Sequence, residues 1–185
     1  MPYEPPPELA SLSLAEVGEL AAARKLPPVD EWRPERIGDS RMRIAADGRW
    51  FHDGGLIARP AMVRAFASLL MRDDRGRHWL MTPHERLSIE VDDAAFIAVD
   101  VKQEGPKEDR ALAFLLNTDE FVVAGPEHKI VARGQAETPA IYLQVRHGTE
   151  ARLNRSTWAQ LAEIALEGDG IAVSSLGMTF LLVPA

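Results

Sequence analysis

The stretch IAADGRWFHDGGLIAR, residues 44–59, directs the path of the first half of the chain. Its two turn sequences, Asp47-Gly48 and Asp53-Gly54-Gly55, tolerate the positive φ angles that hairpin turns require. Around and between these turns, short segments show the period-two pattern of half-buried strands. From Met42 onward, the residues therefore predict a three-stranded antiparallel meander.

The meander contains two adjacent aromatic residues, Trp50 and Phe51. Successive residues of a strand point to opposite faces of a sheet, so the two rings cannot both be buried on one face. One ring then faces the other half of the molecule or a ligand, and Trp50 is our candidate for a ring that contacts a ligand. The alternative is that the ring only covers a sheet edge.

Two amphipathic helices are expected in the body of the chain. Pro60 suits the first position of a helix in which Met62, Phe66, Leu69 and Leu70 recur at helical spacing. The segment STWAQLAEIALEG repeats this apolar pattern later in the chain, with its first residue, Ser156, as a candidate N-cap.

Strand patterns account for most of the remaining residues. Residues 77–91 contain two strands separated by Thr82-Pro83, because proline is excluded from a central strand. Residues 94–125 contain a sequential antiparallel set, residues 128–148 add two strands, and residues 170–183 contain a closing pair. Together the elements predict an α+β fold.

The chain divides into three parts. Residues 1–40 form an N-terminal arm with an extended tail, a Pro-rich linker and a short helix, for which Ser13 and Glu16 have capping-box spacing. Residues 41–94 form a first α+β unit, and residues 95–185 form a second, mainly β unit with one helix.

A degenerate repeat precedes the two helices of the body. Gly55 to Arg59 and Gly148 to Arg152 both read Gly-x-x-Ala-Arg, and each is followed by a helix, an acidic turn with glycine and a strand. Three matching residues in five can be a coincidence. The shared order of elements favours the other interpretation, an internal duplication.

Composition limits the classes of function. The formal net charge of −7 argues against a protein that coats duplex nucleic acid, which needs a broad basic face. The absence of cysteine excludes disulfides, thiolate nucleophiles and Cys-ligated metals. The chain shows no secretory signal and no apolar run that could span a membrane, so we expect a cytoplasmic protein.

Motifs for known chemistries are missing. The five histidines show no metal-ligand spacing, and neither a Gly-x-Ser-x-Gly elbow nor a phosphate-binding glycine loop occurs. We therefore expect no metal and no cofactor. The His52-Asp53 and His84-Glu85 pairs could converge in space, but adjacent strand residues face opposite sides.

Arginines provide the clearest candidates for a binding site. Arg59 and Arg152 each come shortly before a predicted helix, whose free N–H groups and dipole favour an anion, and a guanidinium adds two directed donors. If the two units pack with approximate twofold symmetry, both arginines line one cleft, with Arg146 and Arg155 close by. The alternative is that each pairs with a local carboxylate such as Asp53.

From about Trp32 onward, the chain resembles the bacterial family catalogued as domain of unknown function 1285 (DUF1285). The resemblance is carried by RMRIAADGRWFHDGGLIARPAMVRAFASLL, WLMTPHERLSIEVDDAAF, NTDEFVVAGPEHKI, YLQVRHGTEARLNRSTWAQLAEI and SSLGMTFLL. It implies an internally duplicated α+β fold whose second half is superficially similar to pleckstrin-homology-like barrels. No established activity comes with it.

The resemblance also implies a ligand site between the two halves, for a nucleotide or nucleic-acid-type molecule, and a role in signalling. The site residues implied by its motifs are Arg59, Thr82, Glu85, Asn117, Arg146, Arg152 and Arg155.

These observations predict a regulatory module that binds a small anionic ligand in a cleft between its units. One alternative is a hydrolase-like enzyme acting on a phosphorylated substrate, with Glu85 or Asp53 as the base. Another is a protein-interaction scaffold that binds a protein partner through a sheet edge or the N-terminal arm.

Overall fold

The computed structural model describes residues 9–185, so the extended tail predicted for the first residues lies largely outside the described part. A short 3₁₀ helix, Leu9–Ser11, precedes α1, Leu14–Ala23. Ser13 and Glu16 form the predicted capping box at the start of α1. No helix of the described residues is long and apolar enough to span a membrane.

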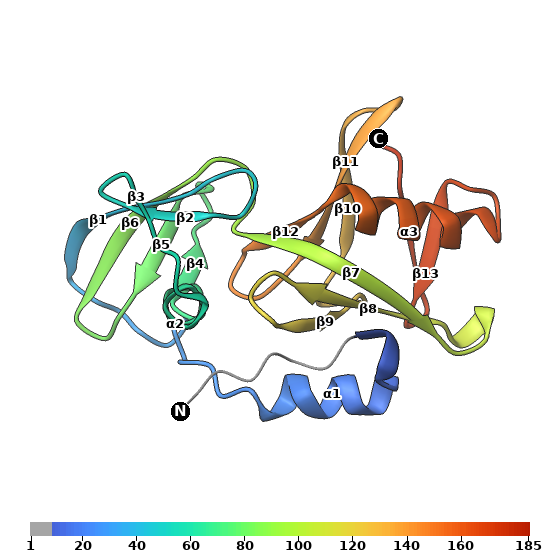
Figure 1. The fold of residues 1–185 in the computed structure, drawn as a ribbon, viewed down its shortest axis with the longest axis horizontal. Helices are drawn as coiled ribbons and strands as arrows, with labels where there is room; N and C mark the ends of the chain where they lie inside the picture. Colours follow the sequence, from blue (N-terminus) through green and yellow to red (C-terminus); the bar gives the residue numbers. More distant parts are fainter. Residues whose placement is uncertain (1–8) are drawn as a thin grey trace.

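The first unit is a six-stranded mixed sheet with one helix (Figure 1). The predicted meander is present: β1 pairs with β2 and β2 pairs with β3, and both pairs are antiparallel. The strand order is β3-β2-β1-β6-β5-β4, with β1 and β6 parallel at the centre. In chain order the elements are β1 (Arg36–Ile44), β2 (Trp50–His52), β3 (Gly55–Leu56), α2 (Pro60–Ala67), β4 (Leu70–Arg72), β5 (His78–Met81) and β6 (Glu85–Val91).

The second unit repeats this arrangement. Its sheet has the order β10-β11-β12-β7-β8-β9, again with a parallel central pair, β7 and β12. After this sheet come α3 and the antiparallel hairpin of β13 and β14. The elements are β7 (Phe96–Glu104), a 3₁₀ turn (Lys107–Asp109), β8 (Ala111–Leu116), β9 (Phe121–Val123), β10 (Ile130–Gln135), β11 (Thr138–Gln144), β12 (Glu150–Leu153), α3 (Arg155–Leu166), β13 (Ala172–Ser175) and β14 (Met178–Leu181).

The internal duplication is therefore present, but in a different alignment from the predicted one. Matching the two sheets strand by strand pairs β1 with β7 and β6 with β12. In the first unit the helix follows the third strand, whereas in the second unit it follows the sixth. Arg59 and Arg152 are thus not equivalent, since Arg59 is the N-cap of α2 and Arg152 lies within β12.

Three local predictions about the helices were wrong. Asn154, not Ser156, is the N-cap of α3, and its side chain accepts the N–H of Thr157. Helix α2 ends at Ala67, so Leu70 lies in a strand that pairs with β5. Leu166, which the apolar spacing of the second helix included, is 72% exposed and does not belong to the buried face of α3. The first strand also begins at Arg36, within the segment assigned to the linker.

One apolar core extends through both units. Trp50 is 1% exposed and stacks on Phe66 of α2, with ring centroids 6.5 Å apart. The prediction that Trp50 contacts a ligand was wrong, because the core side of β2 is covered by α2. Helix α1 lies against β8 and β9, where Val17 is buried (Figure 1).

The turn between β11 and β12 holds the second unit against the first. The amide of Arg72 in β4 donates to the carbonyl of His147 at 2.9 Å. Gly148 has φ +75°, and a Cβ there would lie 2.8 Å from the backbone oxygen of Arg72. Glycine is required for both reasons.

Replacing Gly148 by Ala is expected to destabilise the protein by about 2 kcal/mol more than Gly54→Ala, measured by urea denaturation. Gly54 has φ +80°, but a Cβ there meets no atom within 4 Å, so this variant reports backbone strain alone. If both variants lose the same free energy of unfolding, the close approach of Gly148 to the backbone of Arg72 is contradicted.

A buried carboxylate joins the arm and the second unit. Glu120 is 6% exposed and forms ion pairs with Arg146 and, at 3.3 Å, with Arg24. A second bond from Arg146 reaches the carbonyl of Ala67 in the first unit at 3.0 Å.

Glu120→Gln is expected to lower the free energy of unfolding by about 3 kcal/mol, because two partly buried guanidinium groups lose their countercharge. Asp53→Asn is the matched control, because it breaks an exposed pair with Arg41 and is expected to cost less than about 1 kcal/mol. Chemical denaturation measures both, and similar losses would show that the Glu120 cluster contributes little.

Candidate functional site

A pocket of about 530 Å³ lies between the two units. The first unit contributes Ala46 and Asp47 from the turn after β1. From the second unit come parts of β7, β11 and β12, together with the first turn of α3. The pocket brings together three of the predicted site residues, Asn117, Arg152 and Arg155.

The two arginines differ in their surroundings. Arg152 projects from β12 and forms an ion pair with Asp93 at 2.8 Å. Arg155 is the first residue of α3 and is exposed, and within residues 9–185 its side chain makes no ion pair or hydrogen bond. The helix start adds the positive end of a dipole at the same place.

Most of the remaining wall is apolar. Ile97, Ile141 and Leu153 line it, and the half-buried ring of Trp158 stands one turn into α3. Asn117 supports the junction: its amide oxygen accepts the N–H of Ile97 at 3.0 Å. Its amide nitrogen would be 2.8 Å from a Cβ at Gly48, which explains that glycine.

Two other predicted arginines lie outside the pocket lining. Arg146 is 13% exposed and is held by Glu120, the carbonyl of Ala67 and the ring of Phe96, so its role is structural. Arg59 is exposed at the start of α2. The expectation that Arg59 and Arg152 are matching residues of one cleft is not met.

Thr82 and Glu85 lie at the distant end of the first unit. The Thr82 hydroxyl accepts the amide of Glu85 at 3.0 Å and closes the turn between β5 and β6. The pocket is near the opposite end of β6, where Val91 pairs with Ile44. At about 3.3 Å per residue this separates Glu85 from the pocket by roughly 20 Å.

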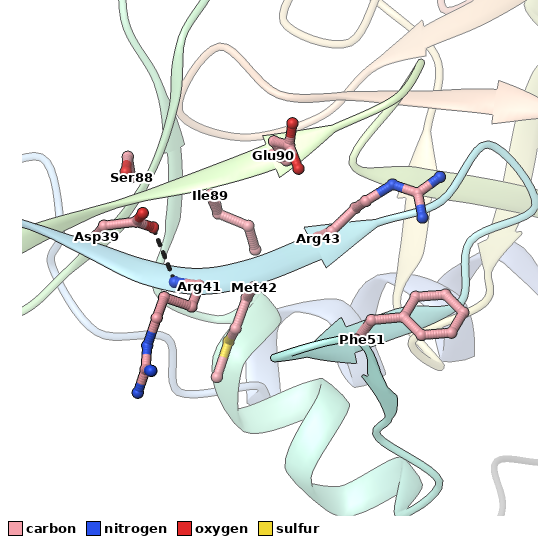
Figure 2. A pocket seen from close by; sticks show the side chains of 9 residues that line it. Asp39, Arg41, Met42, Arg43, Phe51, Ser88, Ile89 and Glu90 are labelled. Carbon is pink, nitrogen blue, oxygen red and sulfur yellow. Dashed lines mark hydrogen bonds between the residues drawn. The ribbon is translucent and has the colours of Figure 1, made fainter.

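A second hollow, of about 650 Å³, lies on the outer face of the first sheet and was not predicted from the sequence. Figure 2 shows Arg43 and Phe51 near one end and Asp39 and Arg41 near the other. Arg43 is bound by Asp92, and Arg41 by Asp53 at 3.2 Å. In the sequence, the alternation of Arg41 and Arg43 was the available signal for a basic surface on β1. The irregularity in β1 that gives Arg41 a φ of 55° could not be predicted from the sequence.

The two hollows occupy related places in the duplicated fold. Asp92 donates its amide to the carbonyl of Ile44 at 3.0 Å, and Asn154 donates to that of Ala98 at 3.1 Å. In this register Glu90 of the first hollow corresponds to Arg152 of the inter-unit pocket. Only the second copy therefore places a cation there.

No group of three potential ligands among the described residues could hold a metal ion. Glu85 and Asp53, the candidate bases, both lie in the first unit and neither lines the inter-unit pocket. Asp53 instead contacts Arg41 and His52.

His78 lies near the junction, half-buried in β5 opposite Arg72. Burial lowers the pKa of His78 to about 4, and the Arg72 guanidinium acts in the same direction, while Glu150 and Asp73 oppose the shift. Between pH 6.5 and 4 the unfolded chain therefore takes up a proton at His78 that the folded protein does not.

Stability is expected to fall as the pH decreases from 6.5 towards 4, and His78→Gln should reduce this slope. Thermal or urea unfolding across the pH series measures the effect. His52→Gln is the control, because His52 is exposed, and it should retain the slope of the unmodified protein. An unchanged slope in His78→Gln would refute the assignment to His78.

The fold and the pocket define a class: a duplicated α+β protein in which two six-stranded mixed sheets enclose a pocket at their junction. A model described as "Domain of unknown function (DUF1285), N-terminal domain" matches residues 27–94. A second, described as "Protein of unknown function (DUF1285), C-terminal domain", matches residues 95–182. The chain belongs to the DUF1285 family, as its resemblance predicted.

Two solved structures are similar to this chain. A DUF1285 family protein from Silicibacter pomeroyi DSS-3 is 39% identical, with a TM-score of 0.79, and the match covers 91% of this chain and 95% of that chain. One from Shewanella baltica OS155 is 22% identical, with a TM-score of 0.53 over 66% and 90% of the two chains, and shows the fold alone. No curated protein matches the chain.

Proposed function

We propose that the protein is a regulatory module that binds a small anionic ligand in the inter-unit pocket. The observation that carries this proposal is Arg155, a cation without a partner among residues 9–185, at the start of a helix and beside Arg152. A cation whose guanidinium forms no ion pair with the described residues, at a concave surface, is suited to an anion from solution.

The acidic side chain in the lining of this pocket, Asp47, is paired with an arginine other than Arg155. Asp47 is bound by Arg49, with 2.7 Å between Oδ2 and Nε, and also accepts the Arg49 amide at 3.1 Å. Asp93 is engaged by Arg152. The guanidinium of Arg155 at the start of α3 therefore remains available to bind an anion.

The other walls favour a ligand that carries a flat ring. The aliphatic side chains of Ile97, Ile141 and Leu153 and the ring of Trp158 offer apolar contacts beside the arginines. A volume of about 530 Å³ accommodates a ligand of nucleotide size. We therefore propose a nucleotide-type ligand, and we also propose the signalling role that the resemblance to the family implies.

The alternative functions have less support. An enzyme needs a base beside the anion-binding group, and the two candidate carboxylates lie away from Arg152 and Arg155. For a scaffold, large exposed apolar side chains such as Leu56, Leu166 and Leu181 occur on β3, α3 and β14, and none of these three lines the pocket that contains Arg155.

Arg155→Ala is expected to weaken binding of inorganic pyrophosphate, and of any nucleotide that raises the melting temperature, by about tenfold. The matched control is Arg59→Ala, which also removes an exposed arginine at a helix start but lies outside the pocket lining. It should change affinity less than twofold. Isothermal titration calorimetry measures both, and equal effects in the two variants would refute the proposed site.

A further inference from the structure

Two adjacent aspartates connect the units, and each binds an arginine of a different unit. They lie in residues 92–95, between β6 and β7. Asp92 forms a bidentate pair with Arg43 of the first sheet, with 2.9 Å between Oδ1 and Nε for one of its two bonds. Asp93 pairs with Arg152 of the second sheet at 2.8 Å.

A second bond holds Asp93 against the second unit. Its Oδ1 accepts the Tyr142 hydroxyl at 2.6 Å, while its Oδ2 accepts a guanidinium nitrogen of Arg152. The Tyr142 ring lies 5.7 Å from the guanidinium carbon of Arg152. The connection is therefore attached to the second unit by a carboxylate that binds a pocket arginine.

Arg152 thus has an internal anion on one side and the pocket on the other. Its side chain is 44% exposed and lines the pocket, whereas Asp93 does not line it. An anionic group that binds in the pocket seeks the same guanidinium donors.

We propose that Asp93 competes with the ligand for Arg152, so that ligand binding removes one of the two side-chain bonds that attach the connection to the second unit. This inference rests on the proposed function, since it requires an anion in the pocket. Asp92 remains bound to Arg43 throughout, so the change is confined to the attachment of the second unit. Asp93 thereby sets the affinity of the pocket and couples its occupancy to the connection between the units.

The neighbouring aspartates provide a matched test with inorganic pyrophosphate as the probe. Asp93→Asn is expected to bind pyrophosphate about threefold to fivefold more tightly, the gain for removing a partly exposed competing ion pair. Asp92→Asn makes the same change of charge one residue away but leaves Arg152 paired, and should change affinity less than twofold. Isothermal titration calorimetry of the full chain gives the three affinities.

A measurement on the unaltered protein keeps the test valid if Asp93→Asn does not fold. In a ¹H–¹⁵N NMR titration with pyrophosphate, the amides of Asp93 and Ala94 should shift with the same midpoint as that of Arg155. Shifts at Arg155 alone, or equal affinities for both Asn variants, would overturn the competition while leaving the proposed site intact. Absence of binding to the unaltered protein would overturn both proposals.

Discussion

The partly buried guanidinium of Arg146 holds the three parts of this molecule together. It lies in the turn between β11 and β12, and it donates to Glu120 of the second unit and to the carbonyl of Ala67 at the end of α2. Arg24, just after α1, pairs with the other oxygen of the same carboxylate. Desolvation offsets much of the attraction within such ion pairs, but removal of one partner leaves an uncompensated charge in a poorly hydrated place.

The position of this turn determines where the pocket lies. Arg146 and the bond from Arg72 to His147 fix the turn against α2 and β4. The backbone approaches so closely at Gly148 that a side chain has no room. Strand β12 begins two residues later, and its end carries Arg152 and the start of α3 to the junction. A contact distant from the pocket thus places its basic groups.

Local patterns predicted those features that depend on neighbours in the chain. The Asp47-Gly48 turn, the Thr82-Pro83 break and the capping box of Ser13 are each specified by adjacent residues, and the structure has them. The family and the presence of a duplication were also predictable. The role of Arg146 was not, because its partners Glu120 and Ala67 are 26 and 79 residues away in the sequence.

The wrong alignment of the repeat has the same origin. Gly-x-x-Ala-Arg occurs before both helices, but Gly148 is required by its approach to Arg72, whereas a Cβ at Gly55 would meet only the carbonyl oxygen of His52, at 3.4 Å. The same five-residue pattern therefore serves different purposes. Trp50 was misassigned because nothing in β2 itself shows which face α2 covers, a property of the sheet as a whole.

Correct alignment of the two sheets shows how one fold yields two chemically different ends. The backbone hydrogen bonds from Asp92 to Ile44 and from Asn154 to Ala98 make Asp92 and Asn154 equivalent positions of the repeat. By the same alignment, Asp93 is equivalent to Arg155. In the first copy this position is an acidic connection, and in the second it is the basic start of a helix. Because α3 follows the sixth strand only in the second copy, that copy has a helix dipole beside its arginines. Opposite charges at equivalent positions of the duplicated fold thus place beside Arg152 an internal anion, Asp93, and a cation, Arg155, that has no ion pair among residues 9–185.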